Sequence, residues 1–255
     1  MRAKSIIFWS FFCVCAGMIG CVPRQVLSPG ASTDAMFGKP DASLEAEGLI
    51  RAVAKIDTEK SGIPYRARAA LILKKPSYLR LEILPLMGVM GLCVITTPQK
   101  MMVYLPSKNE VYTGKPSPQN ISKFIPLPLD AEEMVWMLTG SVPGGTDRDV
   151  EQRLYRENDV WRLDMMWPSG ASQTAWFNEY GLIRLKRFDN DQKKWLSAEY
   201  FYDHRPSPLP SKIVFVMNDG GYVKITYTDV SVDQTDDISM FDMEMPSGVD
   251  IMPLD

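Results

Sequence analysis

The sequence predicts a mainly β protein with two inserted helices, in which a strongly curved sheet carries the helices across its concave side. Apolar and polar residues alternate with a period of two over many short runs. Turn-forming residues separate these runs at short intervals, as in antiparallel sheets. Two segments of helical pattern interrupt the series near the middle of the chain, an order that fits helices packed on one sheet face.

The first half of the predicted sheet is an antiparallel meander. Lys75-Pro76-Ser77 separates two of its alternating runs, and 98–100 and 107–109 are short polar turns. Connections this short join neighbouring antiparallel strands. The predicted strands of this half are 50–56, 65–73, 78–84, 92–97, 101–105 and 110–113.

Two helices are predicted after these strands, over 117–125 and 130–139. Asp130 can cap the second helix, and Gly140 ends it. The segment between them, 125–129, is too rich in proline for either element. The second helix carries an apolar stripe of Met134, Met137 and Leu138.

The second half of the chain returns to strands, and residues 178–181 and 218–221 form hairpin turns. With the first half, the count is roughly eleven to thirteen strands in an all-antiparallel series. The predicted strands are 152–156, 161–166, 173–178, 183–188, 196–202, 212–216, 222–228 and 240–243.

The N-terminus has the pattern of a bacterial lipoprotein signal. Arg2 and Lys4 precede an apolar run too short to span a bilayer, and Ile19-Gly20-Cys21 places a small residue before a cysteine. We therefore predict a signal peptide over 1–20, a lipidated Cys21 with a flexible tether over 21–48, and one folded domain over 49–255. An ordinary secretory signal and an uncleaved anchor are the alternatives.

Composition excludes several classes of function. Removal of Arg2 and Lys4 with the signal changes the formal net charge from −3 to −5, and no basic block predicts a nucleic-acid partner. Of four cysteines only Cys93 would remain beside the lipidated one, within an apolar run that predicts a buried thiol. A single histidine, His204, lies among prolines, and no pattern of metal ligands or catalytic residues occurs. We expect no enzyme activity, metal or cofactor.

The most unusual segment is the connection between the strands predicted at 78–84 and 92–97. Its residues are almost wholly apolar, whereas hairpin loops normally face water. The connection either folds under the helices as core or projects as an apolar finger that contacts lipid. The candidate membrane or cargo residues are Pro85, Leu86, Met87, Gly88, Val89 and Met90.

Methionine is abundant in the chain, with 16 residues. Because its side chain is unbranched, it repacks around ligands of different shape at low cost. The alternative is that these methionines form an ordinary core, and composition alone favours this alternative. Those expected on the concave side are Met87, Met90, Met101, Met102, Met134, Met137, Met165 and Met166.

An ordered set of motifs over about 49–250 resembles the LolA/LolB family of lipoprotein carriers, and especially its LolB-related outer-membrane lipoproteins. A strand followed by a Pro-Leu-Gly loop is typical of that family, and here Met87 is inserted between Leu86 and Gly88. The motifs are the lipobox at Cys21, Arg80–Gly88, Val103–Pro106, Glu110–Gly114, Ile125–Leu129, Glu133–Gly140, Leu209–Ile213 and Phe241–Gly248.

The resemblance implies an open, incomplete antiparallel β-barrel with a helical lid over an apolar cavity. It also implies binding of lipoprotein acyl chains, delivery into the outer membrane, and insertion through Leu86 or Met87. Membrane lipid, lipoprotein acyl chains and a periplasmic LolA-like carrier are the implied partners. Together with the methionine excess, the resemblance predicts an apolar cavity. Its predicted lining residues are Leu81, Ile83, Met101, Val103, Met134, Met137 and Leu138.

Val22 follows Cys21, so no aspartate in that position signals retention in the inner membrane. We therefore expect the periplasmic face of the outer membrane as the location. The alternative function is that of a structural or adaptor lipoprotein with the same fold and a filled interior.

Overall fold

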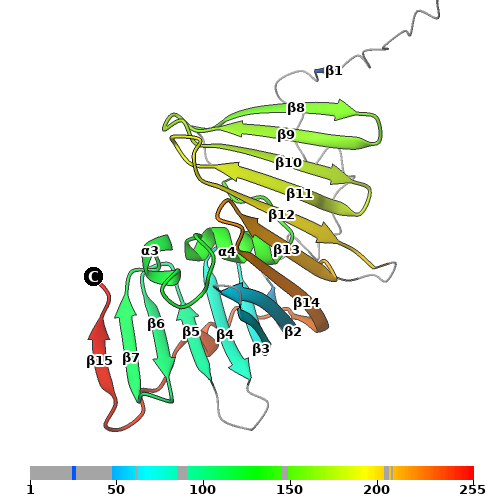
Figure 1. The fold of residues 1–255 in the computed structure, drawn as a ribbon. Coiled ribbons are helices and arrows are strands. Elements are labelled where there is room, and N and C mark those ends of the chain that lie inside the picture. The colour runs from blue at the N-terminus through cyan, green and yellow to red at the C-terminus, as the bar shows by residue number, and fades with distance from the viewer. Residues whose placement is uncertain are drawn as a thin grey trace, which may run out of the picture.

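The computed structural model describes residues 25–26, 48–60, 63–84, 91–144, 149–203, 207 and 209–255. These residues form one long, strongly curved sheet of fifteen strands (Figure 1). In sheet order the strands are β1 (Gln25–Val26), β8 (Glu151–Glu157), β9 (Val160–Met166), β10 (Ser172–Asn178), β11 (Gly181–Phe188), β12 (Trp195–Phe201), β13 (Lys212–Met217), β14 (Tyr222–Asp233), β2 (Leu49–Lys60), β3 (Ile63–Lys74), β4 (Tyr78–Leu84), β5 (Leu92–Thr96), β6 (Met101–Leu105), β7 (Glu110–Gly114) and β15 (Asp250–Pro253).

Strands that are not consecutive in the chain pair at three junctions, β1 with β8, β14 with β2 and β7 with β15. The meanders β2–β7 and β8–β14 each follow the chain, and the pairing of β14 with β2 joins them. The two edge strands, β1 and β15, do not pair with each other, so the sheet is open. We call β2–β7 with β15 the first wing and β8–β12 the second wing.

The prediction of a purely antiparallel sheet is wrong at one edge. β15 runs parallel to β7, with Ile251 opposite Val111. The chain reaches this position after crossing the back of the sheet, so it arrives from the same end as β7. Neither β15 nor the two-residue β1 was predicted from the alternation of residues, because neither is long enough to show a period.

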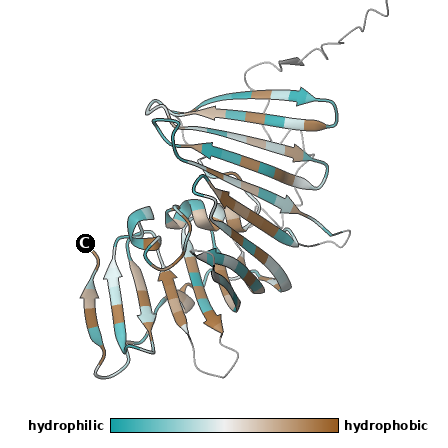
Figure 2. Ribbon diagram, in the orientation of Figure 1, coloured by the Kyte–Doolittle hydropathy of each residue, from teal (hydrophilic) through white to brown (hydrophobic). Residues whose placement is uncertain are grey.

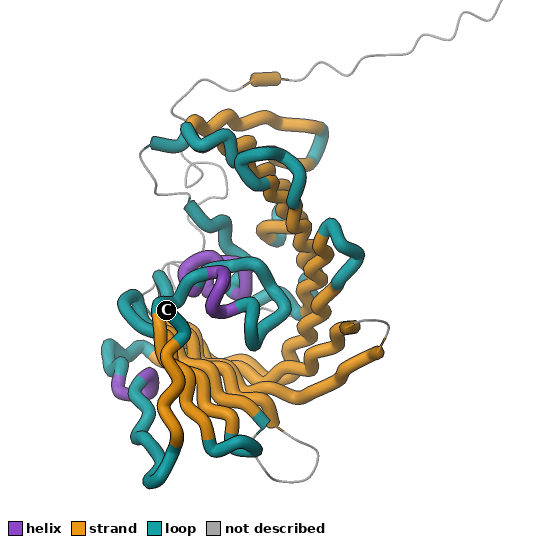
Figure 3. The backbone as a smooth tube through the Cα atoms, turned by 60° about the vertical axis from the view of Figure 1, so that its left-hand side comes forward, coloured by secondary structure: helices purple, strands orange, loops and turns teal. Residues whose placement is uncertain are grey.

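The two helices lie inside the curve of the sheet (Figure 3). α3 (Pro118–Ile121) is shorter than the predicted 117–125, and α4 (Ala131–Leu138) agrees with the prediction. Turns replace the rest of the first helix, because Pro126 and Pro128 cannot continue helical hydrogen bonding. The strand predicted at 240–243 is wrong, since Ser239–Phe241 forms the 3-10 helix η1.

The main core lies between the concave face and the helices. Alternate residues of each strand point into it, which gives the alternation of hydropathy along the second wing in Figure 2. One row of cross-strand neighbours runs through Leu154, Leu163, Ala175, Leu185, Ala198, Phe215 and Val223.

A second, smaller core lies on the convex face of the first wing. Phe241 of η1 packs against Tyr78, with ring centroids 5.2 Å apart, and is buried with Leu49, Cys93 and Ile95. Arg80 donates from Nη1 to the carbonyl oxygen of Met240 at 2.9 Å. The burial predicted for Cys93 is confirmed, and desolvation raises the pKa of its thiol to about 11.

Candidate functional site

The structure brings the predicted cavity residues together. Leu81 and Ile83 come from β4, Met101 and Val103 from β6, and the rest from α4. All belong to or pack on the main apolar cluster, and only Ile83 is half-buried rather than buried. Their side chains pack against one another, and neither of the two hollows described below is lined by them.

Local hydrogen bonds fix where α4 begins and ends. The Asp130 carboxylate accepts from the backbone N–H of Glu133 at 2.8 Å, and the Glu133 carboxylate accepts from the N–H of Asp130 at 3.1 Å. This capping box satisfies two amides that the helix cannot pair internally. At the other end Gly140 adopts φ +70°, a conformation that favours glycine.

Two side chains of the sheet hold α4 near its two ends. Tyr227 of β14 donates its hydroxyl to the carbonyl oxygen of Leu138 at 2.9 Å, and its burial raises the pKa of that hydroxyl. Arg187 of β11 forms an ion pair with Glu133. The helix is thereby attached both to the centre of the sheet and to the second wing.

Three buried polar atoms have no hydrogen-bond partner among the described residues: Nε1 of Trp136, Oε1 of Gln173 and Oη of Tyr200. Gln173 and Tyr200 lie on the concave face, on β10 and β12, and the Gln173 side chain donates from Nε2 to the carbonyl oxygen of Pro143 at 3.1 Å. Buried polar atoms are normally paired. These three atoms are therefore exceptions to that rule among the described residues.

An open apolar hollow of about 460 Å³ lies at the end of the concave face in the first wing. Tyr112 and Phe124 meet edge to face there, with ring centroids 5.1 Å apart. Lys108 and Lys123 place cationic groups beside the apolar lining. The lining residues are Leu92, Leu105, Lys108, Tyr112, Lys123, Phe124 and Leu254.

The C-terminal residues hold one side of this hollow in place. The Asp255 carboxylate accepts from Nδ2 of Asn120 at 2.6 Å and from the backbone N–H of Lys115 at 2.9 Å. These hydrogen bonds, the first above all, lower the pKa of Asp255. Lys123 donates from Nζ to the carbonyl oxygen of Leu254 at 3.3 Å. The last residues of the chain therefore connect β15 to α3.

The lining of the hollow includes the start of β5, which follows the predicted apolar connection in the sequence. Leu92, which lines it, is the first residue of β5, and the N–H of Gly91 donates to the carbonyl oxygen of Ile83 at 3.0 Å. The connection itself, with Pro85, Leu86, Met87, Gly88, Val89 and Met90, lies outside the described residues, as do Cys21 and His204.

A second hollow, of about 500 Å³, lies in the second wing. Trp176, Arg184, Glu199 and Phe201 line part of it, and this hollow was not predicted from the sequence. The available signal was the alternation of arginine with aromatic residues on successive strands. Arg162 and Arg184 lie on the strands that flank Trp176, with their guanidinium carbons 5.7 and 5.8 Å from its ring centroid.

Within the described ranges, no group of three or more histidine, cysteine, aspartate or glutamate side chains could hold a metal ion. A search of the same residues finds no helix that is long and apolar enough to cross a membrane.

No protein-family profile and no curated protein matches this sequence. Solved structures do match its fold. A domain from Vibrio parahaemolyticus described as an outer membrane lipoprotein-sorting protein domain has a TM-score of 0.57 at 12% identity, covering 78% of this chain and 92% of that one. A DUF1329 family protein from Desulfovibrio piger has a TM-score of 0.59 at 14% identity, covering 79% and 92%.

A LolA superfamily protein from Nitrosomonas europaea has a TM-score of 0.53 at 12% identity, covering 79% of this chain and 96% of that one. Likeness at such low identity concerns the arrangement of the backbone, and the mainly β, open sheet described above agrees with it. The chain therefore has a LolA/LolB-like fold.

Proposed function

We propose that this protein is an outer-membrane lipoprotein, anchored through Cys21 at the periplasmic face, that binds acyl chains on the concave side of its sheet and assists the insertion of lipoproteins into the membrane. The proposed partners are membrane lipid, lipoprotein acyl chains and a periplasmic LolA-like carrier. The fold supports a binding role, because a LolA superfamily protein and a lipoprotein-sorting domain have it.

The observation that carries the proposal is the apolar hollow of the first wing. Its volume of about 460 Å³ lies within the usual range for ligand pockets, about 300–1,000 Å³. Each methylene that an acyl chain buries there contributes about 0.8 kcal/mol. Lys108 and Lys123 can face the polar end of such a ligand while Leu105 and Phe124 contact its chain.

A longer acyl chain would need space beneath α3 and α4, which we propose act as a lid. The predicted cavity residues are packed together there, so a ligand would have to displace side chains. Met101, Met134 and Met137 are suited to this, because an unbranched thioether changes its rotamer at low cost. The residues at 85–90 would then contact the membrane, with Leu86 or Met87 entering its apolar layer.

The test is to purify the protein in native form and to extract its lipid for mass spectrometry. We expect an acyl chain to copurify with the wild type and to fall several-fold in Phe124→Ala, which removes an aromatic ring from the hollow. Phe188→Ala removes a ring from β11, outside the hollow, and is the matched control, with an unchanged lipid content.

Absence of any acyl chain from the wild type would contradict the proposal. It would favour the second candidate, a structural or adaptor lipoprotein. The close packing of the predicted cavity residues is the observation that supports this alternative.

A further inference from the structure

Part of the convex face lies outside the second core and carries a row of basic side chains. The pairing of β12, β13, β14, β2 and β3 sets the register of this row, which belongs to strands at the centre of the sheet. Its members, each directly opposite the next, are Phe201, Lys212, Thr226, Lys55 and Arg68.

Lys55 and Arg68 face each other directly across β2 and β3, and both are exposed. Neither forms an ion pair with a described carboxylate. Like charges opposite each other in a sheet are unfavourable. Two like charges that face each other without a compensating ion pair are expected mainly at functional positions. The Lys55–Arg68 pair therefore presents two cations to a partner.

The neighbouring row adds further positive charge. Asp57 lies between two cations, 2.9 Å from Nζ of Lys224 and 3.0 Å from Nε of Arg66. Hydrogen bonding to Lys224, followed by the attraction of both cations, lowers the pKa of Asp57, so this carboxylate stays ionised. One carboxylate between two cations leaves a net positive charge.

The acidic groups on β2, β3, β13 and β14 of this face are few. Besides Asp57 they are Glu59, Asp229 and Asp233, the last of which pairs with Arg51 at 2.7 Å. The cations on the same strands are Arg51, Lys55, Arg66, Arg68, Lys74, Lys212 and Lys224, of which Lys74 pairs with Asp236 at 3.1 Å. Glu199 of β12, at the border, pairs with Arg184. The convex face is therefore net positive although the chain carries −3.

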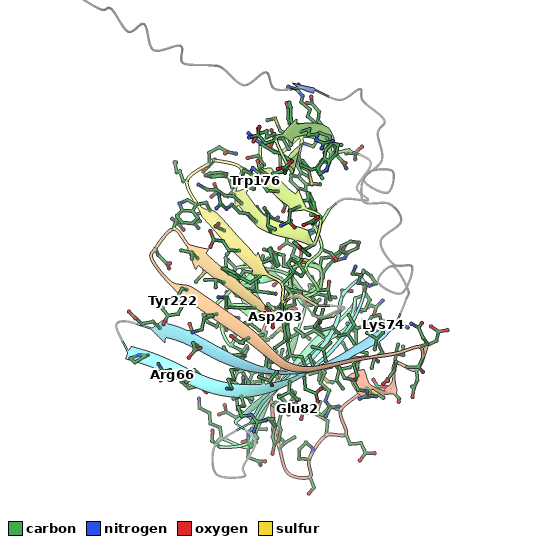
Figure 4. The ribbon with its side chains drawn as sticks, turned by 90° about the vertical axis from the view of Figure 1, so that its right-hand side faces the viewer. Arg66, Lys74, Glu82, Trp176, Asp203 and Tyr222 are labelled. Carbon is green, nitrogen blue, oxygen red and sulfur yellow. The ribbon has the colours of Figure 1, made fainter. Side chains whose placement is uncertain are left out.

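Aromatic side chains accompany these cations. Phe201 is 40% exposed, and Nζ of Lys212 lies 3.7 Å from its ring centroid. Tyr222 lies on the same face as Arg66, and Trp176 continues the face into the second wing (Figure 4). Lysine and arginine mixed with aromatic rings is the composition of protein surfaces at a membrane interface.

We propose that the convex face formed by Lys55, Arg68, Lys212 and Phe201 binds the surface of an anionic phospholipid bilayer. The inference rests on the proposed anchoring to a membrane, which keeps the domain close to such a surface. The row of cross-strand neighbours on this face continues from Arg68 to Leu84. Leu84 immediately precedes residues 85–90 in the sequence, which we propose contact the membrane. Charge complementarity to anionic headgroups determines the choice of partner.

The experiment uses the chain from residue 21, which contains every described residue, with Cys21→Ser so that no lipid anchor contributes. Its binding is measured by sedimentation with vesicles containing about 30% phosphatidylglycerol and with vesicles of phosphatidylcholine alone. We expect binding only to the anionic vesicles, and its loss in about 0.5 M salt, where exposed charges are screened.

Lys55→Gln with Arg68→Gln should weaken this binding at least tenfold, because each basic residue close to an anionic surface strengthens binding about fivefold. The thermal midpoint should stay equal or rise, since two opposed like charges are removed. Lys100→Gln with Lys193→Gln makes the same charge change at exposed turn positions and should leave the binding unchanged.

Equal weakening by the two double variants would overturn the proposal, because net charge alone would then explain the binding. Failure of the wild type to bind anionic vesicles would also overturn it and would leave an acidic protein as the partner of this face. Neither outcome depends on whether an acyl chain copurifies with the native protein, so the proposed function is tested separately.

Discussion

The two wings of the sheet are stabilised in different ways. In the first wing, α4 packs on the concave face and η1 on the convex face, so consecutive residues of β5 and of the first half of β6 are buried. In the second wing only the concave face is buried, and the strands β10 and β12 alternate between buried and accessible residues. A strand with both faces covered needs a continuous apolar run, whereas one with a single covered face needs alternation.

The convex face of the second wing replaces a core with a ladder of charged and aromatic side chains. Cross-strand neighbours in this ladder are Tyr155, Arg162, Trp176, Arg184 and Glu199. Arg162 also pairs with Asp164 at 2.8 Å, and Arg184 with Glu199 at 3.5 Å. The difference teaches that one sheet can be stabilised in two ways. A face covered by another segment of the chain is stabilised by burial of apolar side chains, and a face exposed to water is stabilised by cation–aromatic pairs.

The proposed function places membrane contact at residues 85–90 of the first wing, and one double variant tests this proposal with the largest expected effect. Leu86→Glu with Met87→Glu should reduce lipoprotein delivery to vesicles more than a hundredfold, because burying each apolar side chain in lipid contributes about 1.5–3 kcal/mol. Thermal stability should stay nearly unchanged. A lipoprotein-transfer assay and a melting curve measure the two quantities.

Tyr180→Glu is the matched control in the second wing, since Tyr180 is 57% exposed in the turn between β10 and β11. We expect normal delivery from it. If the double variant fails to fold, residues 85–90 are part of the core, and the assignment of membrane contact to them is wrong.

The second prediction removes the convex core of the first wing. Phe241→Ala should lower the free energy of unfolding by about 3–5 kcal/mol, because Phe241 is buried and the change leaves a cavity next to Tyr78 and Cys93. Urea denaturation measures the change. A loss below about 1 kcal/mol would mean that the segment after β14 does not stabilise the sheet.

The third prediction removes the central ring of the ladder in the second wing. Trp176→Ala should cost about 1–2 kcal/mol, since each of the two cation–aromatic contacts contributes about 0.5–1 kcal/mol when exposed. Trp176→Phe should recover part of this loss in the same denaturation experiment. A cost as large as that of Phe241→Ala would remove the distinction between the two wings.

Sequence patterns predicted most of the fold, because its strands and α4 contain long periodic signals and a capping residue. The boundaries of β4 and β6, and the capping of α4 by Asp130, are as expected. η1 and β15 were missed, since three or four residues show no period and their places depend on contacts with distant strands. The alternation of apolar and polar residues along β12 also could not reveal that Glu199 belongs to the ladder. Membership of the ladder depends on the register between β11 and β12.

The candidate site was predicted only in part. The resemblance and the methionine content selected residues that do lie together, such as Met101 and Met134, but whether they open into a cavity depends on packing that no local pattern encodes. The hollow at Leu105 and Phe124 was missed, because it depends on where the C-terminal Leu254 returns to the sheet.

The smallest predicted effect concerns Asp57, on the convex face of β2, where the first wing meets β14. Its folded pKa is lowered by Lys224 and Arg66, so its contribution to stability is present above the unfolded pKa and is lost as pH falls through the folded pKa. Because these side chains are partly exposed, Asp57→Asn should cost only about 0.5 kcal/mol at pH 7. That difference from the wild type should close in urea titrations below about pH 4. The same variant makes the face more positive and should bind anionic vesicles more tightly, so weaker binding would contradict the membrane role proposed for it.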